Sequence, residues 1–165
     1  MQETDNASTN EYEVHYHRTS VYSLRYHLII VTKYRREVLI GTVKQELEEL
    51  LRSLADQFDL QVEAMEIKPD HVHMLIDASP KHSISSVMKG LKGISARMLL
   101  MHHPEVKQKL YEGHLWQPNY FAVTVSEHSQ EQIADYLRRQ KPGPVKSKEA
   151  SRKPEQSQSK SNQSN

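Results

Sequence analysis

The chain is predicted to form an α+β domain built on an antiparallel sheet. Alternating apolar residues predict strands over residues 22–31, 60–67, 71–77 and 120–125. Apolar residues at three- and four-residue spacing predict three helices, which begin at Thr42, Ser83 and Ser129. The order strand, helix, strand, strand, helix, strand is that of a ferredoxin-like, or RRM-like, sheet. We expect the first two helices to cover one face of this sheet. The added C-terminal helix then covers the other face or reaches a partner subunit.

The first strand and the first helix show the two periodicities most clearly. One face of the strand is apolar and consists of Tyr22, Leu24, Tyr26, Leu28 and Ile30. His27 falls on the other face, from which it can approach a site on the sheet. Thr42 followed by Gln45 has the pattern of a capping box. The helix behind it carries an apolar stripe formed by Val43, Leu47, Leu50, Leu51, Leu54 and Phe58.

Turn and cap residues mark the remaining elements. The short link Pro69-Asp70 between the second and third strands predicts an antiparallel hairpin. Ser83 is expected to cap the second helix, which ends before Pro104. Ser129 is expected to cap the third helix, which runs to Gln140.

One folded domain is expected between two disordered ends. The length of 165 residues suits a single core. Residues 1–19 are polar, and residues 142–165 are rich in Pro, Ser, Gln and Lys, so neither end can bury a core. We therefore place the catalytic domain at residues 20–141, with a disordered basic and polar tail behind it. The absence of cysteine excludes disulfides and thiolate metal sites and fits a reducing cytoplasm. No apolar run approaches the roughly 18 residues that a membrane span needs.

The net charge of +1 hides an uneven distribution of basic residues. They gather in Lys33–Arg36, at Lys89 and Lys92, and between Arg138 and Lys148. Such local clusters can bind a polyanion even when the total charge is near zero. Composition alone does not indicate DNA binding, but it allows it.

The third strand carries the first candidate site, in the segment Pro69-Asp70-His71-Val72-His73-Met74. Side chains two residues apart on a strand point to the same face with their Cα atoms about 7 Å apart, so His71 and His73 can converge on one ion. Val72, Met74 and Ile76 then face the core. A bare His-x-His pattern is more often a pair of ordinary hydrogen-bonded histidines. Two imidazoles also cannot hold a hard ion alone, so a metal site needs a third ligand.

The last helix carries the second candidate site. Tyr136 and Gln140 are four residues apart and therefore lie on the same helix face. A phenol near a cation can act as a nucleophile, and the amide oxygen can be a neutral metal ligand. The simpler interpretation is that Tyr136 only packs beside Ile133 and Leu137, as aromatic residues at helical spacing usually do.

Together these segments resemble the single-tyrosine HUH transposases of bacterial insertion sequences, which move as single-stranded DNA. The resemblance covers about residues 20–141. It rests on Tyr26-His27-Leu28-Ile29, Thr32-Lys33-Tyr34-Arg35-Arg36, Pro69-Asp70-His71-Val72-His73-Met74, Leu91-Lys92-Gly93, Leu115-Trp116-Gln117-Pro118, and Tyr136 with Gln140. None of the four active-site positions departs from the pattern of the family.

The resemblance implies a role for each of these four residues. His71 and His73 would bind a divalent ion, with Gln140 as third ligand, and Tyr136 would be the nucleophile. The product would be a 5′-phosphotyrosine, and the DNA would be a single strand with a hairpin near the element end. Family members are homodimers in which the tyrosine helix of one subunit completes the active site of the other. We therefore expect a cytoplasmic protein that joins the nucleoid when it is bound to DNA.

Imidazole ligands alone favour Zn²⁺ or a later transition metal. A substrate phosphate adds hard oxygen ligands, so the resemblance makes Mg²⁺ or Mn²⁺ the expected ion. One phosphodiester is exchanged for another, so no nucleotide cofactor is expected. The sequence also lacks a Gly-rich phosphate loop.

Basic and aromatic residues next to these segments are candidates for DNA contacts through phosphates and unpaired bases. They are Lys33, Tyr34, Arg35, Arg36, Lys89, Lys92, Arg138 and Arg139. Exposed lysines are as often part of an ordinary solvated surface.

Three other functions remain open at this point. One is a domesticated relative that no longer transposes, either an HUH endonuclease or a hairpin-binding protein acting on genomic repeats. Another is a nuclease of the same fold that hydrolyses DNA with a metal-activated water. The last is a relaxase or replication initiator, although these usually carry further domains.

Overall fold

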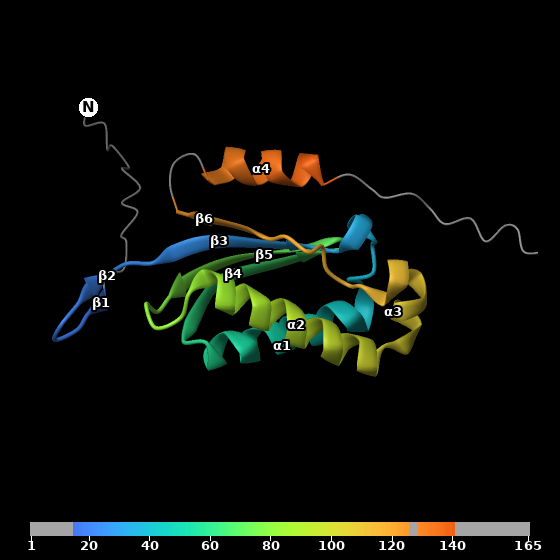
Figure 1. The fold of residues 1–165 in the computed structure, drawn as a ribbon, viewed down its shortest axis with the longest axis horizontal. Coiled ribbons are helices and arrows are strands. Elements are labelled where there is room, and N and C mark those ends of the chain that lie inside the picture. Colours follow the sequence, from blue (N-terminus) through green and yellow to red (C-terminus); the bar gives the residue numbers. More distant parts are fainter. Residues whose placement is uncertain (1–14, 126–128, 141–165) are drawn as a thin grey trace, which may run out of the picture.

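The computed structural model describes residues 15–125 and 129–140. A four-stranded antiparallel sheet lies at its centre, with the strand order β4-β5-β3-β6. Its strands are β3 (Arg25–Val31), β4 (Leu60–Lys68), β5 (His71–Ala78) and β6 (Phe121–Thr124). Helices α1 (Gly41–Gln57) and α2 (Ile84–His102) cover one face of the sheet, and α4 (Ser129–Arg139) lies over the other (Figure 1). The predicted ferredoxin-like fold is confirmed, with the C-terminal helix on the second face of its own sheet.

Shorter elements complete the described chain. They are β1 (His15–Tyr16), β2 (Val21–Tyr22), η1 (Lys33–Arg35), α3 (Pro104–Lys109) and η2 (Tyr111–Gly113). No helix in the described ranges is long and apolar enough to cross a membrane.

The N-terminal boundary differs from the prediction. Strands β1 and β2 pair as a small antiparallel hairpin, so residues 15–19 are ordered rather than disordered. His15 fastens this hairpin to the sheet by donating to the carboxylate of Asp77 on β5. The single strand expected over residues 22–31 is consequently two strands, β2 and β3. The other predicted disordered residues, 1–14 and 142–165, lie outside the described part of the chain.

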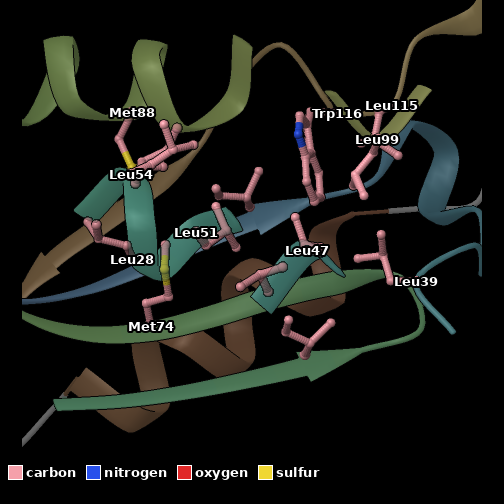
Figure 2. Packing of buried hydrophobic residues seen from close by; sticks show 14 of the residues in the cluster. Leu28, Leu39, Leu47, Leu51, Leu54, Met74, Met88, Leu99, Leu115 and Trp116 are labelled. Carbon is pink, nitrogen blue, oxygen red and sulfur yellow. The ribbon is translucent and has the colours of Figure 1, made fainter. Parts of the chain in front are cut away.

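The main core lies between the sheet and the helices α1 and α2. Leu28 and Ile30 point into it from β3, and Met74 points into it from β5. Figure 2 shows Leu28 and Met74 meeting residues of the helices, of which Leu47, Leu51, Leu54, Met88 and Leu99 are labelled. Because side chains alternate along a strand, Val72, Met74 and Ile76 enter this core while His71 and His73 face away from it.

The opposite face of the sheet holds a much smaller apolar cluster. Ile29 and Val31 of β3 and Ile133 of α4 are its buried members. The partly buried residues Phe121, Tyr136 and Leu137 pack against them. Helix α4 is therefore held on the sheet by few apolar side chains.

The two helix caps differ from each other. Ser83 caps α2 as predicted, because its side chain accepts a hydrogen bond from the N–H of Ser86 at 3.2 Å. The capping box predicted at Thr42 is wrong. Helix α1 begins one residue earlier, at Gly41, whose φ of +57° suits glycine, and no side chain caps it.

Candidate metal and tyrosine site

The two histidines of β5 lie on the face of the sheet that α4 covers. His73 is paired with Ile29 and His71 with Val31, and directly paired residues in an antiparallel sheet share a face. Ile29 and Val31 belong to the small cluster beneath α4. Both imidazoles therefore lie on the face that also receives the tyrosine helix.

His71 is supported by a carboxylate. Its Nδ1 donates to Asp70 Oδ1 at 2.7 Å, since a carboxylate can only accept. This contact leaves the other ring nitrogen, Nε2, as the atom that can face a metal ion. This pairing is the usual second interaction of a metal-binding histidine.

Asp70 is held in turn by Arg35, whose Nε donates to Asp70 Oδ2 at 2.7 Å. Burial raises the pKa of the Asp70 carboxyl, but the hydrogen bonds from His71 and Arg35 outweigh it and bring the pKa below its ordinary value. Arg35 also donates to the backbone oxygen of Leu137 at 3.3 Å. One arginine thus connects the carboxylate behind His71 to the tyrosine helix.

His73 contacts a third histidine. Its Nε2 lies 3.0 Å from Nδ1 of His27 on β3. Burial is the main cause that lowers the pKa of both rings, and the Arg25 guanidinium lowers the pKa of His27 further. Both imidazoles are therefore neutral near pH 7, and neutral imidazole is the form that binds metals.

Tyr136 lies beside this site but is not presented to it. Its ring stacks on Phe121 of β6, with centroids 4.7 Å apart and an interplanar angle of 28°. Phe121 is paired with Ile29, which is paired with His73, so two strand spacings, about 10 Å, separate the backbones of β6 and β5. The Oη atom is buried without a hydrogen-bond partner, and burial raises the pKa of the phenol. In this arrangement the phenol packs in a cluster and is not ready to ionise.

Gln140 follows α4 directly and is partly buried; its backbone N–H donates to the oxygen of Leu137 at 3.3 Å. Among residues 15–125 and 129–140, no three His, Asp or Glu side chains gather closely enough to hold a metal ion. An ion bound by His71 and His73 would therefore need ligands of other kinds, such as an amide oxygen or a DNA phosphate. The donor set predicted from the sequence is of that type.

The candidate DNA contacts around η1 are partly occupied by neighbours. Tyr34 has a φ of 57° and packs edge to face against Tyr111, with centroids 5.1 Å apart. The ammonium of Lys33 lies 5.8 Å from the centroid of the Tyr34 ring. Arg35 is bound to Asp70, and Nε of Arg36 is buried without a partner. This segment is a structured turn rather than a free basic loop.

Lys92 has a different role from the one expected. Its ammonium donates to the backbone oxygens of Gln117, Pro118 and Asn119 at 2.6, 2.8 and 3.0 Å. An ammonium has three donors, so all three are used. Burial lowers its pKa. Lys92 ties α2 to the segment that leads into β6 and has no donor left for a phosphate.

The other basic candidates are exposed. Lys89 lies on the surface of α2. Arg138 and Arg139 both reach Asp135, at 3.5 and 2.6 Å, and remain mostly solvent-accessible. These three residues can reach DNA without breaking the fold.

His27 and Asp70 are the residues that the predicted site lacked. The sequence placed His27 on the correct face but gave it no partner, because the partner depends on the register between β3 and β5. Asp70 stood inside the histidine segment but was interpreted as a turn residue. Its position directly before His71 is the pattern that could have identified it.

Comparison with known proteins identifies the family of the chain. The family model described as "Transposase IS200 like" matches residues 20–140. The ISDra2 transposase TnpA of Deinococcus radiodurans is 46% identical over 123 residues, which are 74% of this chain and 88% of that protein. The transposase for insertion sequence element IS200 of Salmonella typhimurium is 32% identical over 119 residues, which are 72% of this chain and 78% of that protein.

A solved structure shares the fold as well. The crystal structure of a Deinococcus radiodurans R1 protein, described as a candidate transposase, superposes with a TM-score of 0.74 at 43% identity. The match covers 78% of this chain and 99% of that one. Proteins of this family act on DNA as transposases, and the chain matches them over nearly its whole folded domain. The protein therefore belongs to the IS200-like family of single-tyrosine HUH transposases.

Proposed function

We propose that this protein binds hairpin-containing single-stranded DNA and cuts and rejoins it through a 5′-phosphotyrosine on Tyr136. The observation that carries the proposal is the shared sheet face. Two imidazoles, one of them backed by a carboxylate, lie on the face that also receives the tyrosine helix. Membership of the transposase family supports DNA cleavage and strand transfer as the type of reaction.

His71, His73 and Gln140 are the proposed ligands of a divalent ion, Mg²⁺ or Mn²⁺. When bound, the ion would polarise the scissile phosphate and neutralise the charge that develops on its oxygens. Asp70 keeps the proton of His71 on Nδ1, so that Nε2 is the ligand atom. The partly buried setting of His73 keeps its ring neutral.

Tyr136 Oη attacks the phosphorus, and the bond from phosphorus to the 3′ oxygen of the preceding nucleotide breaks. The phenol proton is released, and the leaving 3′ oxygen takes up a proton. The products are a 5′-phosphotyrosine and a free 3′-hydroxyl. A 3′-hydroxyl of another strand then attacks the phosphotyrosine and restores the phenol. Each step exchanges one phosphoester bond for another, so no nucleotide cofactor is consumed.

The phenol has to leave its present position for this reaction. Its hydroxyl is buried, unpartnered and hard to ionise where it stacks on Phe121. Because few apolar contacts hold α4, moving the helix disturbs little of the core. We propose that the protein acts as a homodimer in which α4 of one subunit completes the site of the other.

The nucleophile is tested with Tyr136→Phe and single strands from the DNA that flanks the gene. The strands are labelled at either end, and covalent attachment to protein is followed on denaturing gels. We expect attachment of the 5′-phosphate side by the natural protein and none by Tyr136→Phe, with hairpin binding unchanged. Tyr16→Phe is the matched control, because Tyr16 is 78% exposed. Cleavage without attachment indicates hydrolysis, and hairpin binding without cleavage indicates a domesticated relative.

Sharing of the active site is tested by mixing two inactive variants. One carries His71→Ala with His73→Ala, and the other carries Tyr136→Phe. If the tyrosine acts on the partner's histidines, the mixed dimer forms the covalent adduct that neither variant forms alone. No adduct in the mixture, with dimers shown to exchange subunits, contradicts sharing.

The proposed DNA contacts are Lys33, Tyr34, Arg36, Lys89, Arg138 and Arg139. Arg35 is left out because its guanidinium holds Asp70 and the backbone oxygen of Leu137, and Lys92 because its three donors are used inside the protein. Replacing one phosphate-binding residue, such as Lys89→Gln, should lower the slope of log affinity against log salt by about 1. An unchanged slope removes that residue from the interface.

A further inference from the structure

His27 is a buried histidine to which the proposed reaction gives no role. It is 7% exposed, and it lies on β3 rather than on either segment that carries the proposed ligands. Its ring is tilted against that of His73, with centroids 5.2 Å apart and an interplanar angle of 40°. The two residues are diagonal neighbours across the β3–β5 ladder, since His27 is paired with Leu75 and His73 with Ile29.

The contact allows two arrangements of one proton. Neutral imidazole carries a proton on one ring nitrogen and a lone pair on the other. If Nδ1 of His27 donates, then Nε2 of His73 accepts, the proton of His73 lies on Nδ1, and this ring has no lone pair left for a metal. If Nε2 of His73 donates to Nδ1 of His27, the lone pair of His73 lies on Nδ1 and can bind an ion.

We propose that His27 is a positioning residue of the metal site, whose Nδ1 accepts the Nε2–H of His73 and leaves Nδ1 of His73 as the ligand atom. The inference rests on the proposed function, because it takes His73 as a ligand. Under this proposal, the two histidine ligands are oriented in the same way. Each histidine is oriented by a second partner through its other nitrogen, Asp70 for His71 and His27 for His73.

The geometry agrees with this role better than with a role in packing alone. The same sheet face also carries Arg25, which forms an ion pair with Glu63, and Glu66, which is paired with His73 and bound to Lys68. These charged groups therefore have partners of their own. Within the described chain, His27 is the side chain that a hydrogen-bond contact links to His73.

The proton arrangement is measured first, without metal. Nitrogen NMR of the imidazole side chains in the full chain distinguishes the two tautomers of His73. We expect His73 to carry its proton on Nε2 and His27 to accept on Nδ1. A proton on Nδ1 of His73 overturns the proposal.

The second measurement is the affinity for Mn²⁺ of the full chain, followed by the electron spin resonance of the free ion. His27→Leu should weaken binding about 10- to 100-fold, as loss of such a partner usually does. His27→Asn places an amide oxygen near the position of Nδ1 and should restore most of the affinity. His114→Leu, at an exposed histidine outside the site, should change nothing. Thermal melts of each variant show that it is folded.

His73→Ala distinguishes a failure of the positioning role of His27 from a failure of the metal site itself. If His73→Ala weakens Mn²⁺ binding but His27→Leu does not, the positioning role fails and the metal site stands. If neither variant weakens binding, the metal site itself fails and the inference with it. Equal losses for His27→Leu and His27→Asn also contradict the proposal, because an acceptor at this position would then be without effect.

Discussion

The two faces of the central sheet differ in what holds them together. On β3, Leu28 and Ile30 enter a large core shared with α1 and α2, whereas Ile29 and Val31 enter a small cluster beneath α4. All four side chains are fully buried. The side chains of β3 alternate regularly between the two faces of the sheet, but the apolar cluster on one face is much larger than the cluster on the other. The difference shows that the fold is stabilised mainly from one side, and the proposed site lies on the other.

The α4 face also contains groups that a purely structural face would avoid. The hydroxyl of Tyr136 is buried without a partner, and such a group costs about 1–3 kcal/mol. His27 and His73 meet in the same partly buried region. Departures from good local packing tend to occur where function requires them. Both features agree with the proposed movement of α4.

Adjacent residues of β3 provide the strongest test of this comparison. Leu28→Ala opens a cavity in the main core and should lower the free energy of unfolding by about 2–5 kcal/mol. Ile29→Ala should lower it by less, close to about 2 kcal/mol, because α4 can settle into the space. Urea denaturation of both variants measures the difference. Equal losses mean that α4 is as firmly packed as α1 and α2.

Lys92 links α2 to the segment that precedes β6, the strand on which Tyr136 stacks. Lys92→Met leaves three carbonyl oxygens without their donor and should lower the free energy of unfolding by about 1–3 kcal/mol. Lys89→Met, on the exposed surface of the same helix, is the control and should change it little. If both variants are equally stable, the three hydrogen bonds of Lys92 add nothing to the fold.

Tyr136→Phe should separate stability from activity. Removing an unpartnered buried hydroxyl should raise the free energy of unfolding by about 1 kcal/mol while it abolishes the covalent adduct. A clear loss of stability instead means that the hydroxyl has a partner in solution, and the resting position of α4 then differs from the one described.

The same variant has a pH signature. Burial raises the folded-state pKa of Tyr136 above its ordinary value of 10.0. The natural protein should therefore lose stability as the pH rises from 10 through this raised pKa, because only the unfolded chain ionises readily. Denaturation at pH 9 and pH 11 should show a smaller loss for Tyr136→Phe. If both proteins lose the same stability between pH 9 and pH 11, the phenol of Tyr136 is exposed to water in the folded protein.

The smallest expected effect lies on the stable face, where Glu46 of α1 accepts hydrogen bonds from His102 and His103. Burial lowers the pKa of His103, but Glu46 and Glu105 outweigh it and raise the pKa above 6.5. The stability from this contact is complete below pH 6.5 and is lost as the pH rises through the raised pKa. Glu46→Gln should reduce this dependence between pH 6 and pH 8. If Glu46→Gln leaves the pH dependence of stability unchanged, that dependence comes from other groups.

The sequence alone determined the order of the main strands and helices, the face on which the side chains of β5 lie and the four active-site candidates. Strand and helix periods are local properties, so the alternation along one strand suffices to place His71 and His73 together and Val72 and Met74 in the core. The tyrosine helix was predicted from its spacing and its resemblance to a family. Local patterns were less reliable at ends, as Thr42 and the hairpin of residues 15–22 show.

The tertiary structure decided which of these residues meet. The contact between His27 and His73 depends on the register of two strands whose contacting residues are 46 positions apart in the sequence. The bonds from Lys92 to the segment before β6, and the stacking of Tyr136 on Phe121, likewise join separate elements. The periodicity of a strand or helix fixes the direction in which a side chain points from that element. Only packing between elements fixes its distance from a side chain elsewhere, and that distance decides whether a histidine is a ligand partner and whether a phenol is buried.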